Sequence, residues 1–400
     1  MIPLIKSLML KGKRVLLRAD FNAPIKNKEI THDYRLKAAL PTINYIQEQG
    51  GKVILLTHLG RPKESTFDEN LSTRIIVPWL EKQGYHVDYE IDLMQAIDQT
   101  HMHYNNILLI ENLRFFIGEK HVNINFAQLL AQLGDLYIDD AFGVIHRADT
   151  SLTLLAEQFA PENRACGLLV QKEMHELAQI RQNPELPFVM VLGGSKLDDK
   201  IGMIEQFARQ DKARRISTLV AGGLVGQILL AAQGKMLAPA NASGDALAHA
   251  KKALRLAQEF DITLVLPSDF LVINDSGDTP TICALDQVPE QSQCVDIGPK
   301  TIAQFNEVVT LARTIFANGT MGIYEETAYT QGTKAVFSAI ASSSAYTVIG
   351  GGDAVAATFQ YGLADKMDYL STGGGATLAY LAAQNPEEEL PGLKALLHKL

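Results

Sequence analysis

The sequence predicts an α/β protein of two doubly wound, Rossmann-like lobes, each built on a parallel sheet, joined by a hinge helix. The strand-like segments are short continuous apolar runs, a pattern typical of parallel strands that are buried on both faces. Amphipathic helical segments separate these runs, as in a series of β-α-β units. The length of 400 residues is enough for two or three domains with sizeable cores.

A helix near the middle of the chain is predicted to connect the two lobes. Its apolar residues recur every three to four positions, the spacing of one helical face: Leu169, Val170, Met174, Leu177 and Ile180. Asn183-Pro184 is expected to end it. The predicted division is a first domain (1–167), the connecting helix (168–184), a second domain (185–380) and a C-terminal segment (381–400) that packs back on the first domain. An ordinary crossover helix within one domain is the alternative.

The composition excludes several classes of function. The net charge of −9 argues against general nucleic-acid binding, although a local arginine cluster can still bind a small anion. Three cysteines without a CxxC pair indicate reduced thiols and neither a disulfide scaffold nor a zinc site. We find no signal peptide and no run of about 18 apolar residues. We therefore expect a cytoplasmic protein with no membrane or nucleic-acid partner.

In the first half of the chain, the predicted strands end in polar residues. In order, Val15–Ala19 is followed by Asp20 and Asn22 with Arg35 on the next segment, Val53–Thr57 by His58 and Arg61, Ile107–Ile110 by Arg114, and Leu136–Ile138 by Asp139, Asp140, His146 and Arg147. The carboxyl ends of parallel strands share one edge of the sheet, where ligands collect. Because a guanidinium can bind phosphate or carboxylate bidentately, this density predicts a site for a multiply charged anion. For any single arginine, a solvated surface charge is the alternative.

In the second half, most of the predicted strands end in glycine. In order, Phe188–Leu192 is followed by Gly193-Gly194, Ser217–Ala221 by Gly222-Gly223, Thr263–Leu266 by Pro267-Ser268-Asp269, Thr314–Ala317 by Asn318-Gly319, Tyr346–Ile349 by Gly350–Gly352 and Asp353, and Asp368–Leu370 by Gly373–Gly375. Glycine at a strand-to-helix turn lets the backbone approach a phosphate closely. The pattern therefore predicts a nucleotide site, although neither GxxxxGKS/T nor GxGxxG occurs.

Three charged residues of this half are candidates for phosphate and metal binding. Lys196 and Lys200 lie four residues apart, so we expect them to share one helical face and to reach phosphate oxygens. Asp353 is a candidate ligand for the Mg²⁺ that accompanies such phosphates. Its alternative role is the N-cap of a helix that begins at Ala354.

The chain resembles the phosphoglycerate kinase family from about residue 11 to residue 376. The motifs occur in that family's order: RADFNAP, THDYR, THLGRP, ENLRF with GEK, DDAFGVIHRA, GGSKLDDKI, DIGPKT, ANGTMGIYE, GGGDA and STGGGA. The resemblance implies reversible, Mg²⁺-dependent phosphoryl transfer between ATP and 3-phosphoglycerate in glycolysis and gluconeogenesis. It also implies a monomer that bends at a hinge.

The resemblance assigns 3-phosphoglycerate to the first lobe. The implied substrate-binding residues are Asp20, Asn22, Arg35, His58, Arg61, Arg114 and Arg147. Of these, Asp20 and Asn22 would hold the hydroxyl and carboxyl end. The arginines at positions 61, 114 and 147 would bind the phosphate that is not transferred. Arg35 would stabilise charge on the phosphoryl group in transfer.

The resemblance assigns the nucleotide to the second lobe. The implied nucleotide-binding residues are Gly194, Lys196, Lys200, Gly222, Asn318, Gly319, Glu325, Gly352, Asp353 and Ala354. Among them, Lys196, Lys200 and Asn318 would hold phosphates and Glu325 the ribose hydroxyls. Asp353 would be the metal ligand. The implied catalytic residues are Arg35, Lys196, Gly373 and Gly374, the last two through amides of the Gly373–Gly375 turn that face the transferred phosphoryl group.

Several positions depart from the family pattern. Asp149 stands where the family usually has His, Ala317 and Thr320 where it has Trp and Pro, and Ala354 where it has Thr or Ser. A Glu-Gly-Lys segment is missing before Leu390-Pro391-Gly392, which Glu387–Glu389 precede directly. Two alternatives remain open. One is a phosphoglycerate-kinase-like protein that binds a ligand or partner with weak or no turnover, and the other is a nucleotide-dependent sugar kinase.

Overall fold

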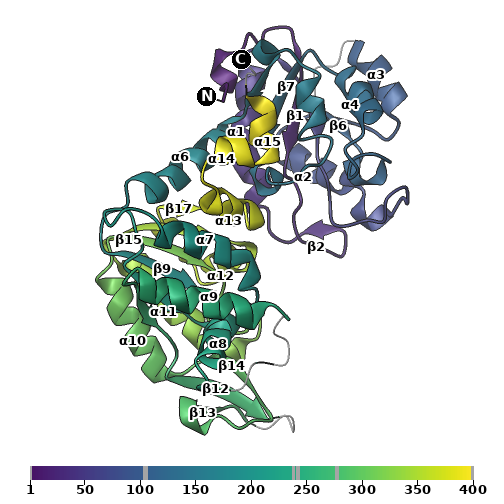
Figure 1. Ribbon diagram of the computed structural model, residues 1–400. Helices are drawn as coiled ribbons and strands as arrows, with labels where there is room; N and C mark the ends of the chain where they lie inside the picture. Colours follow the sequence, from purple (N-terminus) through teal and green to yellow (C-terminus); the bar gives the residue numbers. More distant parts are fainter. Residues whose placement is uncertain (1, 102–106, 237–238, 240–243, 275–278, 398–400) are drawn as a thin grey trace. The chain divides into compact units, whose positions relative to one another are not determined.

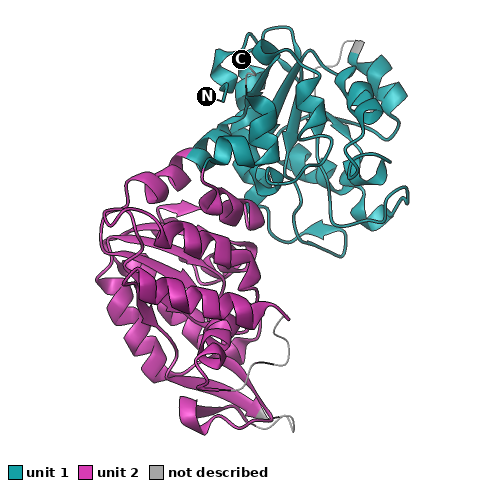
Figure 2. Ribbon diagram, in the orientation of Figure 1, with its two compact units in different colours: residues 1–174, 385–400 teal, residues 175–384 magenta. Residues whose placement is uncertain are grey.

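The computed structural model describes residues 2–101, 107–236, 239, 244–274 and 279–397. The chain forms two compact units, one of residues 1–174 with 385–400 and one of residues 175–384 (Figure 2). The boundary between positions 174 and 175 lies inside α6 (Leu168–Gln182), the helix predicted as a connector. The assignment of one substrate to each unit stays a prediction.

Unit 1, residues 1–174 and 385–400, contains a six-stranded sheet in the order β5-β6-β4-β1-β7-β8, with every pairing parallel. Its strands are β1 (Arg14–Ala19), β4 (Lys52–Leu56), β5 (Val87–Glu90), β6 (Ile107–Ile110), β7 (Leu136–Asp140) and β8 (Arg164–Cys166), and a hairpin is formed by β2 (Ile25–Lys26) and β3 (Glu29–Ile30) (Figure 1). Its helices are α1 (Tyr34–Glu48), α2 (Val77–Lys82), α3 (Leu93–His101), α4 (Ile124–Ala131), α5 (Leu154–Glu157), α14 (Pro386–Glu389), α15 (Pro391–Leu396) and the start of α6.

The strand order of unit 1 places a ligand crevice. From β1 the chain moves to β4 on one side, and it later returns to β7 on the other side of β1. In open α/β sheets, ligands bind beyond the carboxyl ends of the strands at such a reversal. The strand interiors are fully buried and apolar, as at Leu17, Leu55 and Ile138, so the sheet holds the residues that follow these strands in fixed positions.

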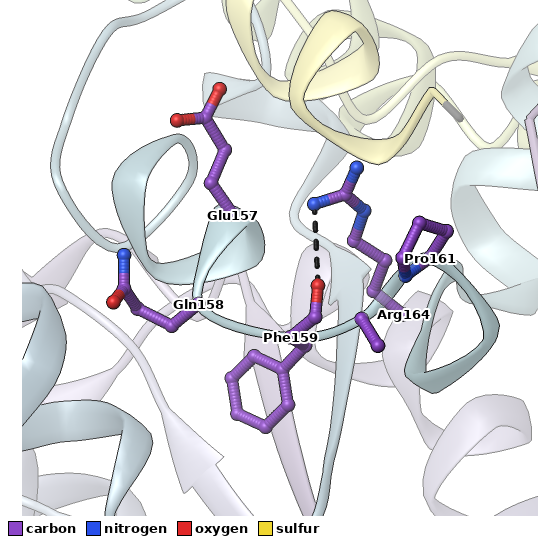
Figure 3. Close-up of a pocket in the computed structure, with 6 residues that line it drawn as sticks. Glu157, Gln158, Phe159, Pro161 and Arg164 are labelled. Atoms are coloured by element: carbon purple, nitrogen blue, oxygen red, sulfur yellow. Dashed lines mark hydrogen bonds between the residues drawn. The ribbon is translucent and has the colours of Figure 1, made fainter. Parts of the chain in front are cut away.

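Of the predicted C-terminal segment (381–400), residues 385–400 belong to unit 1 and residues 381–384 belong to unit 2, and residues 398–400 lie outside the described residues. Gly392 N donates to the Ile145 carbonyl at 2.9 Å. The Arg164 guanidinium donates to the carbonyls of Ala156, Phe159 and Leu397, and so joins the ends of α5 and α15 (Figure 3). These contacts leave a surface hollow of about 410 Å³ beside Arg164, to which we assign no ligand because three carbonyls already engage the guanidinium.

Unit 2, residues 175–384, contains a second parallel sheet in the order β11-β10-β9-β15-β16-β17 and a small antiparallel sheet, β13-β12-β14. The strands are β9 (Phe188–Leu192), β10 (Thr218–Ala221), β11 (Thr263–Val265), β12 (Asp269–Asn274), β13 (Thr281–Ala284), β14 (Ser292–Ile297), β15 (Thr314–Asn318), β16 (Tyr346–Gly350) and β17 (Tyr369–Leu370) (Figure 1). The helices are α7 (Asp198–Ala208), α8 (Gly223–Ala232), α9 (Ala246–Glu259), α10 (Pro299–Thr310), α11 (Gln331–Ser342), α12 (Gly352–Gln360), α13 (Gly375–Ala382) and the end of α6.

The helices of unit 2 pack in two groups, one of α7, α8, α9 and α13 and one of α10, α11 and α12. Two groups are what a sheet covered on both faces requires. The prediction of two parallel-sheet α/β units is therefore confirmed. Among the described residues, no helix combines the length and the apolar character of a membrane span.

Buried aspartates at strand ends cap helices in both units. Asp140 Oδ1 accepts hydrogen bonds from Leu169 N (2.9 Å) and Val170 N (3.1 Å) at the start of α6. In unit 2, Asp269 accepts from Thr301 N at 2.8 Å, in the first turn of α10. A carboxylate at a helix N-terminus satisfies free amides and complements the helix dipole. Asp140 therefore acts in the structure as a cap, and its position after β7 has a structural explanation.

Candidate functional site

The first half of the candidate site begins with Asp20, which follows β1 and is 5% exposed. Asp20 Oδ1 accepts from Asn22 N at 3.3 Å, and Asp20 Oδ2 lies 3.5 Å from Arg35 Nη1. Asn22 Oδ1 accepts from Gly60 N at 2.8 Å, which holds the β4 loop to the β1 loop. Arg35 comes from the first turn of α1 and not from a strand end. The structure thus brings these predicted residues together.

His58, which follows β4, is fully buried. Burial and the neighbouring Arg18, Arg114 and Arg147 lower the pKa of His58 well below its usual value. The fully buried Arg18 contacts His58 Nδ1 through Nη2 at 3.1 Å. A guanidinium can only donate, so Nδ1 accepts and the ring proton is on Nε2. The Nε2 atom is buried without a partner among the described residues, so it is a donor free for a ligand.

Arg18 is a site residue that the strand-end prediction missed. It lies inside β1, ahead of the strand-end positions from which the site was predicted. Its Nε donates to Ser151 Oγ at 2.9 Å, and Ser151 Oγ donates to Glu119 Oε1 at 2.7 Å. Burial raises the pKa of Glu119 to about 7, although Arg18 acts in the opposite direction. A guanidinium, a hydroxyl and a carboxyl therefore form a buried chain behind His58.

Arg114 supplies further free donors. It is 3% exposed, and its Nε and Nη2 have no hydrogen-bond partner among the described residues. Burial, followed by repulsion from Arg147, lowers the pKa of Arg114 to about 10. Of the other predicted residues, Arg147 is partly buried and Arg61 is exposed. Buried donors without acceptors are costly, and their clustering with several cations indicates an anion-binding site.

His146 is a second residue outside the substrate-binding set that the resemblance implies. Its Nδ1 is buried without a partner in the described part of the chain, and burial followed by Arg147 lowers its pKa. It directly precedes Arg147 in the sequence, which was the available signal.

Asp149 places a negative charge inside this cationic cluster. The residue is 5% exposed. Its Oδ2 lies 3.9 Å from Arg114 Nη2, and its Oδ1 lies 3.7 Å from Lys120 Nζ. Neither distance is a hydrogen bond, so the carboxylate neutralises Arg114 without occupying its donors.

Glu111 and Asn112 support the loops that carry these residues. Asn112 Nδ2 donates to the carbonyls of Leu59 and Leu71, both at 2.8 Å. Its Oδ1 accepts from Arg114 N at 3.1 Å, which caps the 3-10 turn η4 (Leu113–Phe115). Glu111, 2% exposed, accepts hydrogen bonds from Ser72, Thr73, Tyr89 and Asn112. The two residues join β6 to the loop after β4.

In unit 2, the glycine-rich turns after β9, β10 and β15 pack on one another. Gly193 N donates to Asn318 O at 2.9 Å and Gly194 N to Thr320 O at 2.7 Å. A Cβ at Gly193 would lie 2.2 Å from Thr320 O, and one at Gly319 would lie 2.4 Å from Gly193 O. Backbone packing therefore explains these two glycines. Contact of Gly194, Gly222 and Gly319 with a nucleotide stays a prediction.

Asp353 lies in the first turn of α12 with an exposed side chain. The alternative that it is the N-cap is wrong, because Gly351 with φ +96° occupies that position. A Cβ at Gly352 would meet no described atom within 4 Å, so this backbone is open to a ligand. Ala354 is fully buried, so its side chain is packed inside the unit.

The turn before α13 differs from the prediction at Gly373. Its amide donates to Ser371 Oγ at 3.2 Å, and its carbonyl accepts from Thr377 Oγ1. The Gly373 amide is therefore engaged within the turn, which leaves Gly374, the N-cap of α13, as the better candidate for a phosphoryl contact.

Lys196 and Lys200 do not share one helical face, and that prediction is wrong, because α7 begins only at Asp198. Lys196 is exposed ahead of the helix. Lys200 is 5% exposed, and its Nζ donates to the Lys196 carbonyl at 2.9 Å. Burial lowers the pKa of Lys200 to about 8, while Asp199 and Asp353 act to raise it. Lys200 and Asp353 therefore lie in one electrostatic environment.

Tyr324 is a neighbour of this group that the prediction left out. Burial, followed by the charges of Asp353 and Glu325, raises the pKa of Tyr324 to about 12. The exposed Glu325 thus belongs to the same region as Asp353. The departure at Thr320 has a local role, because its Oγ1 donates to the Gly322 carbonyl at 2.9 Å.

The donor set around Asp353 suits a metal ion that is bound mainly through a substrate. Among the described residues, no group of three His, Cys, Asp or Glu side chains could hold a metal. Mg²⁺ usually takes one or two carboxylates and completes its shell with substrate phosphates and water. A single exposed carboxylate beside Lys200 fits that mode.

The whole chain resembles solved kinases. A family model described as phosphoglycerate kinase matches residues 5–384. The phosphoglycerate kinase structure from Pyrococcus horikoshii OT3 matches with a TM-score of 0.85 at 31% identity, covering 99% of this chain and 98% of that one. The structure from Coxiella burnetii matches with a TM-score of 0.81 at 33% identity, with the same two coverages. The chain therefore belongs to the phosphoglycerate kinase family.

Proposed function

We propose that the chain catalyses reversible phosphoryl transfer between ATP and the carboxylate of 3-phosphoglycerate, with Mg²⁺ as the nucleotide's counter-ion. The observation that carries the anion half is the set of buried, unpartnered donors on His58 and Arg114. The nucleotide half is supported by Lys200 and Asp353 beside the open backbone at Gly352.

The 3-phosphoglycerate would lie beyond β1, β4, β6 and β7. Its phosphate would take the free donors of Arg114 together with Arg61 and Arg147. The Nε2 proton of His58 would donate to a substrate oxygen, because Arg18 donates to Nδ1 and burial lowers the pKa of the ring well below its usual value. Asp20 and Asn22 would orient the hydroxyl and carboxyl end.

The nucleotide would lie beyond the strands of unit 2. Lys196, Lys200 and Asn318 would hold its phosphates and Glu325 the ribose hydroxyls, with the backbone of Gly194, Gly222, Gly319 and Gly352 alongside. Asp353 would be the protein ligand of Mg²⁺, which supplies charge neutralisation on the phosphate oxygens. Ala354 would contribute only its backbone.

The chemistry requires positioning more than covalent assistance. A carboxylate oxygen of 3-phosphoglycerate bonds to the γ-phosphorus as the bond to the β,γ-bridging oxygen breaks, which gives an acyl phosphate and ADP. No proton has to be removed from the nucleophile, so no general base is needed. Arg35, Lys196 and the Gly374 amide would stabilise charge on the transferring group, as such reactions require.

We further propose that the enzyme is a hinge-bending monomer of the cytoplasm that works in glycolysis and gluconeogenesis. Its net charge of −9 is compatible with partners that are small anions and not nucleic acid. The binding-protein alternative has no supporting observation, since all charged residues implied by the resemblance are present.

Steady-state kinetics in both directions, with and without Mg²⁺, test this proposal. We expect turnover that depends on Mg²⁺ and falls strongly in Arg35→Ala. A clean protein that binds both substrates but turns over in neither direction would replace the proposal with the binding-protein alternative.

A further inference from the structure

Among the described residues, Asp149 is the one carboxylate that lies within 4.0 Å of both Arg114 and Lys120. Its distances to Arg114 Nη2 and Lys120 Nζ are 3.9 and 3.7 Å. Both Asp149 Oδ2 and Arg114 Nη2 are buried without hydrogen-bond partners among the described residues. The pair is therefore close enough to attract and too far apart to satisfy either group.

The cations around Asp149 repel one another. The pKa of Arg114 is lowered by burial and then by Arg147, and that of Lys120 by burial and then by Arg114, while Asp149 acts to raise both. The same two charges act on His146, since Arg147 lowers its pKa and Asp149 raises it. Burial and, less strongly, the charge of Asp149 raise the pKa of Glu119, while Arg18 and the hydrogen bond from Ser151 lower it. Without a ligand, Asp149 is the counter-charge that relieves this repulsion.

A phosphate monoester in this site would meet Asp149 as a like charge. It carries about −1.5 to −2 at neutral pH, and the free donors of Arg114 that would receive it are the atoms nearest to Asp149. Two like charges within about 4–6 Å disfavour each other's charged forms, and an interaction worth one pKa unit corresponds to about a tenfold change in an equilibrium. The same repulsion acts on the bound phosphate.

We propose that Asp149 is an internal counter-anion that sets the phosphate affinity of this site: it stabilises the empty cluster and weakens binding of the substrate's phosphate. The inference rests on the proposed phosphate site at Arg114. It concerns specificity and affinity and gives Asp149 no part in the transfer step. The opposite role, in which Asp149 orients Arg114 for the phosphate, predicts the opposite change on removal.

Asp149→Asn tests the inference, because it removes the charge while keeping the shape, and the Asp149 Oδ2 hydrogen bonds that it could disturb are absent. Asp149→Ser removes the same charge with a smaller side chain, which covers a failure of the first variant to fold. Asp88→Asn on the exposed edge strand β5 is the matched control. Binding of inorganic phosphate and of 3-phosphoglycerate is measured by calorimetry at low and high salt, with thermal unfolding of the ligand-free proteins.

We expect Asp149→Asn to bind both ligands about tenfold more tightly at low salt, with a smaller gain at high salt. The ligand-free variant should unfold at a lower temperature than the wild type, and kcat should change little while the KM for 3-phosphoglycerate falls. Asp88→Asn should match the wild type. Unchanged or weaker phosphate binding in both Asp149 variants would overturn the inference.

Arg114→Gln separates this inference from the proposed function. If Arg114→Gln abolishes phosphate binding while the Asp149 variants leave it unchanged, the proposed phosphate site stands and the counter-anion role is wrong. If Arg114→Gln binds phosphate like the wild type, the phosphate site itself is wrong, and the inference falls with it.

Discussion

Replacing Glu111 should weaken 3-phosphoglycerate binding without any direct contact to the substrate. Glu111 Oε1 accepts from Thr73 N (2.7 Å), Thr73 Oγ1 (2.9 Å) and Asn112 N (2.6 Å), and Oε2 accepts from Ser72 Oγ (2.7 Å) and Tyr89 OH (2.5 Å). In Glu111→Ala, two backbone amides are left without acceptors. A buried unsatisfied donor costs about 1–3 kcal/mol, so the local loss is on the order of 2–6 kcal/mol.

That loss falls on the loops that hold the anion-binding donors. Arg114 Nη1 donates to the Gly60 carbonyl, and Asn112 fixes the Leu59 and Leu71 carbonyls. We therefore expect the KM for 3-phosphoglycerate to rise at least about tenfold, which is about 1.4 kcal/mol, while the KM for ATP and the kcat at saturation stay within a factor of a few.

Steady-state kinetics with each substrate varied in turn measure the effect. Glu111→Gln keeps one acceptor oxygen and should show a smaller increase in KM. Tyr89→Phe is the control, since it removes a hydroxyl donor and leaves every backbone amide paired. The reasoning is refuted if Glu111→Ala loses thermal stability but keeps the wild-type KM for 3-phosphoglycerate, or if the KM for ATP rises equally.

Three further perturbations test other parts of the site. Arg35→Ala should lower kcat about 100-fold, as the loss of a transition-state donor does. Arg61→Ala should mainly raise the KM for 3-phosphoglycerate. If Arg35→Ala raises KM and leaves kcat unchanged in steady-state kinetics, the roles assigned to these two arginines are wrong. Because the Ala354 side chain is fully buried inside unit 2, neither Ala354→Ser nor Ala354→Thr should tighten ADP binding in calorimetry, and the added bulk of Ala354→Thr should cost about 1–3 kcal/mol of stability. Tighter ADP binding by Ala354→Ser would show instead that the hydroxyl reaches the phosphates. Burial raises the pKa of Asp139 from 3.8 to about 7, so the folded state keeps a proton that the unfolded chain has lost, and stability falls by up to about 1.4 kcal/mol per pH unit across that window. Asp139→Asn should therefore stabilise the protein more at pH 8, above the folded-state pKa of Asp139, than at pH 5, below it. Equal shifts in melting temperature at the two pH values would show that ionisation of Asp139 does not affect stability.

The sequence was sufficient for most of the strands that form the two parallel sheets. Buried apolar runs identify β1, β4, β9 and β15 to within a residue or two, because a strand covered on both faces is mostly apolar. The same rule placed Asp20, His58 and Arg114 at one sheet edge. It missed β5, which has no fully buried position, and β8, which has only three residues. It also missed the β12–β14 sheet, whose outer strands β13 and β14 carry exposed positions.

The partners of the site residues could not be predicted, because they depend on contacts between distant segments. Glu111 reads as one polar residue after a strand, and only the folded chain brings Thr73 and Tyr89 to it. Arg18 lies within β1, ahead of the strand-end positions, and only the folded chain shows that it is fully buried against His58 and Ser151. The prediction that Lys196 lies on a helix was wrong for a local reason, because α7 begins only at Asp198, after the turn that follows Gly194.

The most direct measurement of the proposed activity is ³¹P NMR of ATP, 3-phosphoglycerate and Mg²⁺ incubated with the protein. We predict the appearance of ADP together with an acyl phosphate resonance, loss of the acyl phosphate resonance on addition of excess ADP as the reaction reverses to ATP, and no conversion when a chelator removes Mg²⁺. Two results would contradict phosphoryl transfer to the carboxylate, provided that the substrate resonances broaden on binding. In one, ATP is not consumed and no acyl phosphate forms. In the other, the γ-phosphate of ATP appears only as inorganic phosphate.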